Sequence, residues 1–400
     1  MKLQTEKITW RNFFYNDRVA AALWFGLAFI GIVVEVYHKG TSGNYALFKG
    51  VYQHTIQQTN LFVHYPEYED INHYGHFFSL IILPFYYLPD KIGIVLWVLF
   101  NAAFLYYAIR QLPVSRKYQN FILVFSAHEL MLASEWQQTN QMIAACIIIG
   151  FVAINKSKET WASFFFLFAA FIKLYGVVGF AFFFFSKNKL KLIGWSIVWG
   201  ALFFVAPMLL SSYNFIIQTY FDWYNELVYK ANKNVRLDIN NDYQDISVMG
   251  MVRRIFKVQE FRNIWITLPA ITLFVRNYFD WKHFADLRFR LYMLCLVLLM
   301  TVIFTTSAES PTYIIAFPAV CIWYVLQPKT KWLTPFFIFA LLLTSFSYSD
   351  IFTPYVREHI VRPYSLKALP CFVMWCIITV QIIRKQFLKV DISLLRTSND

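Results

Sequence analysis

The chain has 400 residues, of which 58% are hydrophobic, 20% are aromatic and only 15% are charged. A water-soluble protein carries more charge and fewer aromatic side chains, so this composition excludes an ordinary soluble domain. The formal net charge is +13. In a membrane protein such an excess belongs to cytosolic loops rather than to a nucleic-acid site. The motif GxxxxGK[ST] does not occur, which disfavours an ATP-driven pump.

Apolar segments of nearly membrane-spanning length follow one another through the whole chain. They lie at approximately 19–37, 91–109, 120–134, 140–155, 192–211, 263–277, 291–306, 312–327, 332–348 and 368–384. The run at 161–186 has lysines on both sides, so we expect it to enter the membrane and return as two short helices, with Lys173 near the turn. Residues 1–400 are therefore predicted to form one all-α, polytopic membrane domain with about 12 transmembrane helices.

The segment 77–89, "FFSLIILPFYYLP", is apolar but too short to span a membrane comfortably. If it lies in the outer membrane interface instead, the basic loops "NKSKE", "KNKLK" and "PKTK" all fall on one side, which the positive-inside rule makes cytosolic. The tails 1–18 and 385–400 are then cytosolic, and 38–90 and 212–262 form two long outer loops. Long ordered loops in a compact protein usually carry function.

The first outer loop holds a dense group of titratable residues in the stretch "YPEYEDINHYGHFF". Carboxylates near a low-dielectric membrane can act as bases, which makes Glu69 and Asp70 candidate catalytic residues beside Tyr74 and His76. The alternative is a solvated loop with aromatic side chains at the interface. His73 and His76 have the spacing of a metal-binding pair, but no further pattern completes such a site, so none is predicted.

Two more polar groups interrupt apolar segments on the predicted outer side. Gln138 and Asn140, in "SEWQQTNQMIAA", are placed either to orient sugar hydroxyls or to cap the following helix. Lys173, in "AAFIKLYG", is placed either to neutralise a phosphate or to reach the interface along its aliphatic stem.

Later in the chain, "NNDYQDISVMGMVRRIF" contains Gln244, Ser247 and Arg253, which form either a phosphate-binding segment or an amphipathic interfacial helix. The stretch "TTSAESPTYIIAFP" places Glu309 and Tyr313 on a short turn. The carboxylate of Glu309 either faces the first-loop cluster or belongs to a plain polar turn. Each pattern is weak alone, and their common position on one side of the membrane is what predicts a functional site there.

Six stretches, taken in chain order, resemble glycosyltransferase family 87 of the GT-C superfamily. They are "GNYALFKGVYQ", "YPEYEDINHYGHFFSLIILPFYYLPDKIGIVLWVLFNAAFLYYAI", "QTNQMIAACIIIG", "FAAFIKLYGVVG", "YQDISVMGMVRR" and "SPTYIIAFP", and they cover roughly residues 20–330. The resemblance implies a polytopic enzyme whose active site lies at the outer membrane face, with a catalytic acid in the first outer loop. It also implies an inverting transfer from a polyprenyl-phosphate sugar, in which the lipid phosphate leaves.

The sequence departs from the pattern of that family at three places. Asn44 stands, ahead of Lys49, at the position where many members carry an aspartate. His76 replaces a proline, and Tyr313 lies in a region where many members carry histidines. An asparagine cannot accept the proton, so the catalytic base must lie elsewhere.

We therefore expect a cell-membrane glycosyltransferase that moves a hexose, with mannose as the first candidate, to a lipid or glycan acceptor. The candidate bases are, in order of preference, Asp70, Glu69, Glu309 and Glu35. The candidate substrate-binding residues are Lys173, Arg253 and Lys49 for the donor phosphate, and Gln138, Asn140 and Gln244 for sugar hydroxyls. No cofactor is predicted, and no ligand spacing requires a divalent metal.

Two other classes of protein stay open. A transporter or flippase of lipid-linked sugars needs polar groups along a path through the membrane centre. Here the main candidates for such a path are His128 and Glu129 in "SAHELML". The third possibility is a non-catalytic partner in a larger envelope complex.

Overall fold

The computed structural model describes residues 13–39, 43–68, 70–235, 243–258 and 261–395. Within these ranges the protein is all-helical and has no β-strand, although an isolated bridge joins Val114 to Leu395. The predicted all-α class is confirmed.

Each apolar segment expected to span the membrane is helical. These helices are α1 (Asp17–Val34), α4 (Asp90–Arg110), α5 (Arg116–Glu135), α6 (Asn140–Asn155), α7 (Glu159–Ile172), η3 (Leu174–Phe185), α8 (Lys189–Val205), α11 (Ile264–Arg276), α12 (Leu287–Ile303), α13 (Phe317–Leu326), α14 (Leu333–Ala340) and α16 (Ala368–Ile383). How many of them cross a membrane stays a prediction.

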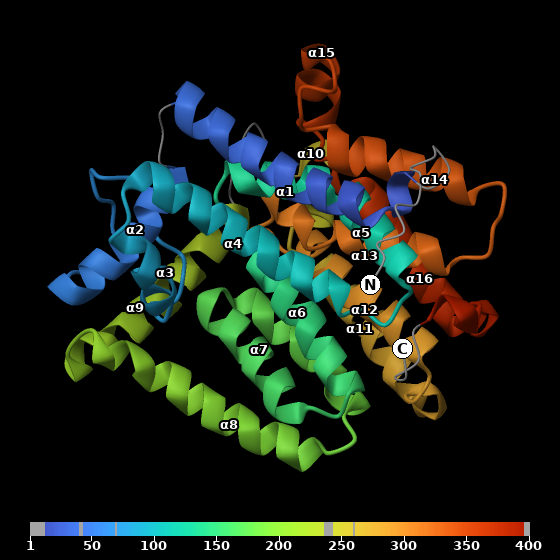
Figure 1. The fold of residues 1–400 in the computed structure, drawn as a ribbon, viewed down its shortest axis with the longest axis horizontal. Helices are drawn as coiled ribbons and strands as arrows, with labels where there is room; N and C mark the ends of the chain where they lie inside the picture. The colour runs from blue at the N-terminus through green and yellow to red at the C-terminus, as the bar shows by residue number, and fades with distance from the viewer. Residues whose placement is uncertain (1–12, 40–42, 69, 236–242, 259–260, 396–400) are drawn as a thin grey trace, which may run out of the picture.

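The two segments expected to be long outer loops contain helices of their own. These are α2 (Gly43–Gln57), α3 (Phe78–Tyr86), α9 (Tyr213–Val235) and α10 (Val248–Phe256). Helix α3 forms where a short interfacial helix was predicted, and its depth in a membrane stays a prediction. Figure 1 shows α2, α3 and α9 gathered at the left edge of the molecule. Helices from both predicted outer loops therefore lie toward the same edge, whereas α10 is drawn away from them.

Short helical turns connect these elements. They are η1 (Phe13–Tyr15), η2 (Glu35–Lys39), η4 (Ala206–Leu209), η5 (Asn277–Phe279), η6 (Trp281–His283), η7 (Ser310–Ile314), η8 (Leu341–Phe346), α15 (Pro354–Val356), η9 (Arg357–Val361), η10 (Gln386–Lys389) and η11 (Ile392–Leu394). Among them η7 follows directly after Glu309, one of the candidate bases of the sequence analysis.

Helices α6, α12 and α13 form the centre of the fold. Nearly all of their residues are buried, as expected for helices that are apolar on every side. Helix α6 packs against α7 and α4, and α12 packs against α13 and α16. Helices α1 and α5 make the most extensive pair at the periphery of this centre. The beginning of α6 and the turn before α13 are thereby held in fixed positions.

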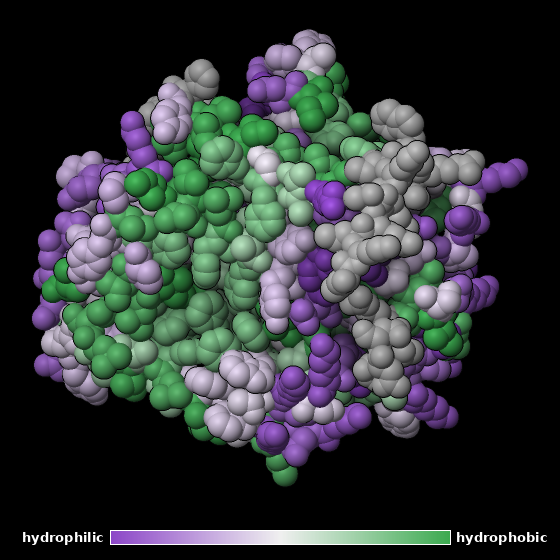
Figure 2. Space-filling model, in the orientation of Figure 1, coloured by the Kyte–Doolittle hydropathy of each residue, from purple (hydrophilic) through white to green (hydrophobic). Residues whose placement is uncertain are grey.

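The outer surface of the bundle is apolar over a wide area. Three described helices are long and apolar enough to cross a membrane, namely Asp17–Tyr37, Asp90–Arg110 and Lys189–Leu209. Helix α8 exposes Ile197 and Leu202, among other apolar side chains. Figure 2 shows a broad hydrophobic area with hydrophilic residues along the left edge and toward the right. This distribution supports a membrane protein whose polar ends lie on opposite sides.

The hairpin of α7 and η3 is packed around Phe166. A Cβ atom at Gly150 of α6 or at Gly179 of η3 would collide with the Phe166 ring. A Cβ atom at Gly176 would collide with the backbone of α7, so the chain turns back tightly. The two helices pack against each other, and Lys173 stands between them at the turn. The apolar run therefore folds back on itself as two short helices, as expected, and its entry into a membrane stays a prediction.

We predict that Gly150→Ala destabilises the protein, because the new methyl group must displace the Phe166 ring. Overpacking of this kind costs about 1–3 kcal/mol of unfolding free energy. Gly194→Ala in α8 is the matched control, since a Cβ atom there has no neighbour within 4 Å. Thermal unfolding in detergent should show a lower Tm for Gly150→Ala and an unchanged or slightly higher Tm for Gly194→Ala. Equal values would contradict the packing described.

Candidate active site

Glu309 is the carboxylate on which separate parts of the chain converge. It caps η7 as its N-terminal residue, and its backbone N–H donates to Thr312 Oγ1 over 3.1 Å. The Gln244 Nε2 atom donates to Glu309 Oε1 over 2.7 Å, and Gln138 Nε2 donates to Oε2 over 3.4 Å. The Glu309 carboxylate is thus oriented by two amides and remains partly accessible.

Gln138 joins this carboxylate to a lysine. Its Oε1 atom accepts hydrogen bonds from Lys173 Nζ at 3.2 Å and from the Tyr74 hydroxyl at 3.2 Å. Lys173 also donates to Asn140 Oδ1 over 3.3 Å and lies 4.8 Å from the centre of the Tyr74 ring. The structure therefore brings Tyr74, Gln138, Asn140, Lys173 and Glu309 together, as the sequence analysis predicted for one functional site.

Burial controls the charge of the two lysines at this site. It lowers the pKa of Lys173 to about 8, although the nearby Glu309 carboxylate acts in the opposite direction. Burial also lowers the pKa of Lys230 in α9, where Glu309 favours the charged form and Lys173 disfavours it. Two partly desolvated lysines thus lie within electrostatic reach of one carboxylate, which is an arrangement that attracts an anionic group.

Helix α9 was missed as part of the site. Its Trp223 Nε1 donates to the His73 carbonyl over 3.1 Å, and its Glu226 carboxylate lies 3.1 Å from His73 Nδ1. Further along, Asn234 Nδ2 donates to Ser307 Oγ over 3.1 Å. Trp223, Glu226, Lys230 and Asn234 follow at intervals of three or four residues, which places them on one helical face. That spacing was the available signal.

The acids of the first outer loop lie at the margin of the site. Asp70 is exposed and accepts a hydrogen bond from the Ile71 N–H over 2.8 Å. Its charge still acts on Lys230 and Tyr74, so it lies within electrostatic reach of the Glu309 cluster. Glu69 lies outside the described residues.

His76 is buried against the Tyr220 ring, with 4.0 Å between the ring centres. Burial lowers its pKa to about 3, so the imidazole is neutral at physiological pH. Neither ring nitrogen has a hydrogen-bond partner among the described residues. The structure therefore gives His76 a position in the packing between the first loop and α9.

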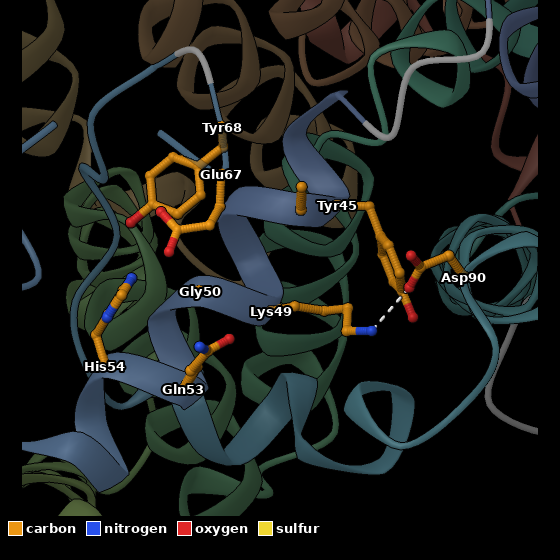
Figure 3. Close-up of a pocket in the computed structure, with 9 residues that line it drawn as sticks. Tyr45, Lys49, Gly50, Gln53, His54, Glu67, Tyr68 and Asp90 are labelled. Carbon is orange, nitrogen blue, oxygen red and sulfur yellow. Dashed lines mark hydrogen bonds and ion pairs between the residues drawn. The ribbon is translucent and has the colours of Figure 1, made fainter. Parts of the chain in front are cut away.

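Several other predicted binding residues are engaged within the fold and do not face Glu309. Asn44 donates to the Trp136 carbonyl over 2.7 Å, and Arg253 Nε donates to Asp245 Oδ2 over 3.0 Å. Ser247 caps α10, and the Tyr313 hydroxyl donates to the Ile246 carbonyl over 2.8 Å. Lys49 is paired with Asp90 in a separate pocket (Figure 3).

A buried ion pair between Lys367 and Glu129 contacts the first residue of η7. Lys367 Nζ is 3.0 Å from Glu129 Oε1, and neither side chain is accessible to solvent. The same ammonium donates to Ser310 Oγ over 3.0 Å, and Ser310 is the residue after Glu309. Glu129, a candidate for a polar transport path in the sequence, is thus satisfied by Lys367, and the pair helps to fix the turn that carries Glu309.

No group of three or more His, Cys, Asp or Glu side chains able to hold a metal occurs among the residues that the structure describes. The prediction that no metal is required stays a prediction. The chemistry available at the cluster is that of a carboxylate acting beside two lysines.

We predict that Glu129→Ala severely destabilises the protein, because it leaves the Lys367 ammonium buried without its partner. Loss of one member of a buried pair costs about 3–5 kcal/mol of unfolding free energy. The double variant Glu129→Leu/Lys367→Met replaces the pair by apolar side chains and should recover most of that loss. Thermal unfolding of both variants in detergent tests this, and the prediction fails if the single variant is as stable as the wild type.

The comparisons with known proteins agree with the resemblance seen in the sequence. The profile of glycosyltransferase family 87 matches residues 72–306, which is more than half of the chain. No curated protein matches the chain. The matched region includes Tyr74, Gln138, Asn140, Lys173 and Gln244, and it ends three residues before Glu309. The chain belongs to glycosyltransferase family 87.

Proposed function

We propose that this glycosyltransferase transfers a hexose from a polyprenyl-phosphate sugar to a lipid or glycan acceptor at the outer face of the cell membrane. The family supports the transfer of a sugar. The distribution of short basic loops supports the outer face. Mannose is the first hexose to test, because the resemblance to polyprenyl-phosphate-dependent enzymes points to it. The observation that carries the proposal is the arrangement of Glu309 and Lys173 around the Gln138 amide, with Lys230 within electrostatic reach of Glu309.

Glu309 is our preferred base. It is held by Gln138 and Gln244 and is partly accessible, whereas Asp70 lies on an exposed loop at the margin of the site. In the reaction, Glu309 takes the proton of an acceptor hydroxyl. The acceptor oxygen then attacks the anomeric carbon of the donor and forms the new glycosidic bond. Attack from the face opposite the leaving group inverts the anomeric configuration.

The leaving group is the lipid phosphate, which departs with the electrons of the broken carbon–oxygen bond. It already carries negative charge and gains more in the transition state, so it needs cations rather than a strong acid. Lys173 and Lys230 are the residues that we assign to this phosphate. The side-chain amides of Gln138, Asn140 and Gln244 are placed to position sugar hydroxyls by exchanging their present contacts.

We predict that Glu309→Gln lowers the rate of sugar transfer by about 10²–10⁴-fold, the usual contribution of a general base. Asp70→Asn should change the rate much less. The assay uses purified protein in liposomes with a panel of polyprenyl-phosphate hexoses and with lipid and glycan acceptors. Full activity of folded Glu309→Gln would exclude this residue as the base. Loss of activity in Asp70→Asn alone would instead assign the role to Asp70.

We also predict that kcat/KM for the donor falls as pH rises through about 8, the pKa of Lys173. The lysine is charged below that pKa and loses its charge above it, so its attraction for the donor phosphate is lost on the alkaline side. Lys173→Arg keeps its charge at all these pH values and should remove the alkaline decline. Lys173→Met should have a low kcat/KM for the donor at every pH. An identical alkaline decline in Lys173→Arg would assign the titration to another group.

A further inference from the structure

A second polar pocket lies between α2 and the loop that follows it, apart from the Glu309 cluster. Its volume is about 140 Å³, and it is lined by Tyr45, Ala46, Lys49, Gly50, Gln53, His54, Glu67, Tyr68 and Asp90. Figure 3 shows the Glu67 carboxylate, the Gln53 amide and the His54 ring directed toward the same space beside Gly50. Three separate segments therefore contribute to one small site.

The walls of this pocket are held by contacts among its lining residues and by one contact with helix α3. Lys49 Nζ is bound to Asp90 Oδ1 at 2.7 Å, and the Tyr45 hydroxyl donates to the Phe85 carbonyl over 2.9 Å. A Cβ atom at Gly50 would lie only 2.5 Å from the Tyr68 ring, so glycine is needed for the ring to lean against α2. The pocket is therefore part of the folded structure rather than a gap between mobile side chains.

Polar side chains that can contact a ligand line the pocket. Glu67, which is exposed to solvent, and Gln53, which is half-buried, make no side-chain hydrogen bond to other described residues. Beside them, the His54 Nε2 atom is buried and has no hydrogen-bond partner among the described residues, and burial lowers the pKa of the imidazole. A carboxylate, a primary amide and a tyrosine side chain together suit hydroxyl groups on a compact ring.

The charge of the pocket argues against an anionic ligand. The ammonium of Lys49 is already neutralised by Asp90, which leaves the carboxylate of Glu67 as the remaining charge. A phosphate would be repelled by that carboxylate. The cavity volume of about 140 Å³ suits a compact ligand. A single neutral sugar ring meets both conditions.

A chain of contacts connects helix α2, which lines the pocket, to the Glu309 cluster. Phe48, next to Lys49 in α2, packs edge-on against the Tyr74 ring with 5.0 Å between ring centres. The Tyr74 hydroxyl in turn donates to Gln138, which holds Glu309. Helix α2 thus lies between the two polar sites, and its buried Phe48 side chain packs on the side of the Glu309 cluster.

We infer that this pocket binds a neutral monosaccharide ring of an extended acceptor glycan. The role as an acceptor subsite rests on the proposed function, whereas the binding of a neutral sugar does not. In this arrangement Glu67 accepts from ring hydroxyls, Gln53 both donates and accepts, and Tyr68 packs against the ring. Lys49 shapes the site through Asp90 and does not contact the donor phosphate.

The test measures direct binding of simple glycosides to the full-length protein in lipid nanodiscs. The probes are methyl α-mannopyranoside, methyl β-glucopyranoside and methyl β-galactopyranoside. Their binding is detected by saturation-transfer NMR. We expect at least one glycoside to bind. The substitutions Glu67→Gln and Gln53→Ala should each weaken the affinity for that glycoside about tenfold. Neither residue supports the fold through a hydrogen bond, so both variants should keep the wild-type Tm. Gly194→Ala in α8, which lies outside the pocket, is the control and should bind the glycoside as the wild type does.

Three results would overturn the inference. They are the absence of binding by every glycoside, binding that is unaffected by Glu67→Gln and Gln53→Ala, and preferential binding of inorganic phosphate over the glycosides. If the glycosides bind in this pocket but no donor supports transfer, the proposed reaction is wrong and the sugar site stands. If transfer proceeds but Glu67→Gln leaves the KM for the acceptor unchanged, the pocket is not the acceptor subsite.

Discussion

The amide of Gln138 is the interaction on which the site depends. A primary amide has a donating end and an accepting end, and here the donating end faces Glu309 while the accepting end faces Lys173 and Tyr74. The Glu309 carboxylate and the Lys173 ammonium are therefore held near each other without forming a direct ion pair. A pair in direct contact would leave less of either charge for a substrate.

This arrangement needs a rigid support, because an amide orients its partners only if its own backbone is fixed. Gln138 lies just before α6, which is buried along almost its whole length. Lys173 stands at a tight turn that is closed around Phe166, and Glu309 begins a turn tied to the buried Lys367. The polar groups at the site thus lie at the ends of three helical elements. The positions of these elements are set by packing in the apolar centre.

The helices were predictable from sequence because the length and composition of each apolar segment are local properties that need no knowledge of the rest of the fold. The convergence of Glu309, Gln138 and Gln244 was not, since it depends on contacts between residues 65 to 171 positions apart. The prediction that placed Glu309 opposite the first-loop cluster came from membrane sidedness alone. Helix α9 was missed because its mean character is polar and aromatic, so the search for apolar runs passed over its periodic polar face.

Lys49 shows why residue type alone could not assign ligand-binding roles. A lysine in an outer loop of such an enzyme is a reasonable phosphate ligand. Its charge is available to a phosphate only if no carboxylate of the protein already forms an ion pair with it. Asp90 begins α4, where a negative charge also stabilises the helix N-terminus, and its carboxylate holds the Lys49 ammonium. Lys173 makes its hydrogen bonds to neutral amide oxygens, which leave its positive charge uncompensated at close range. The difference between a structural and a ligand-binding lysine therefore lies in the partner that the fold supplies, and the partner is visible only once the helices are assembled.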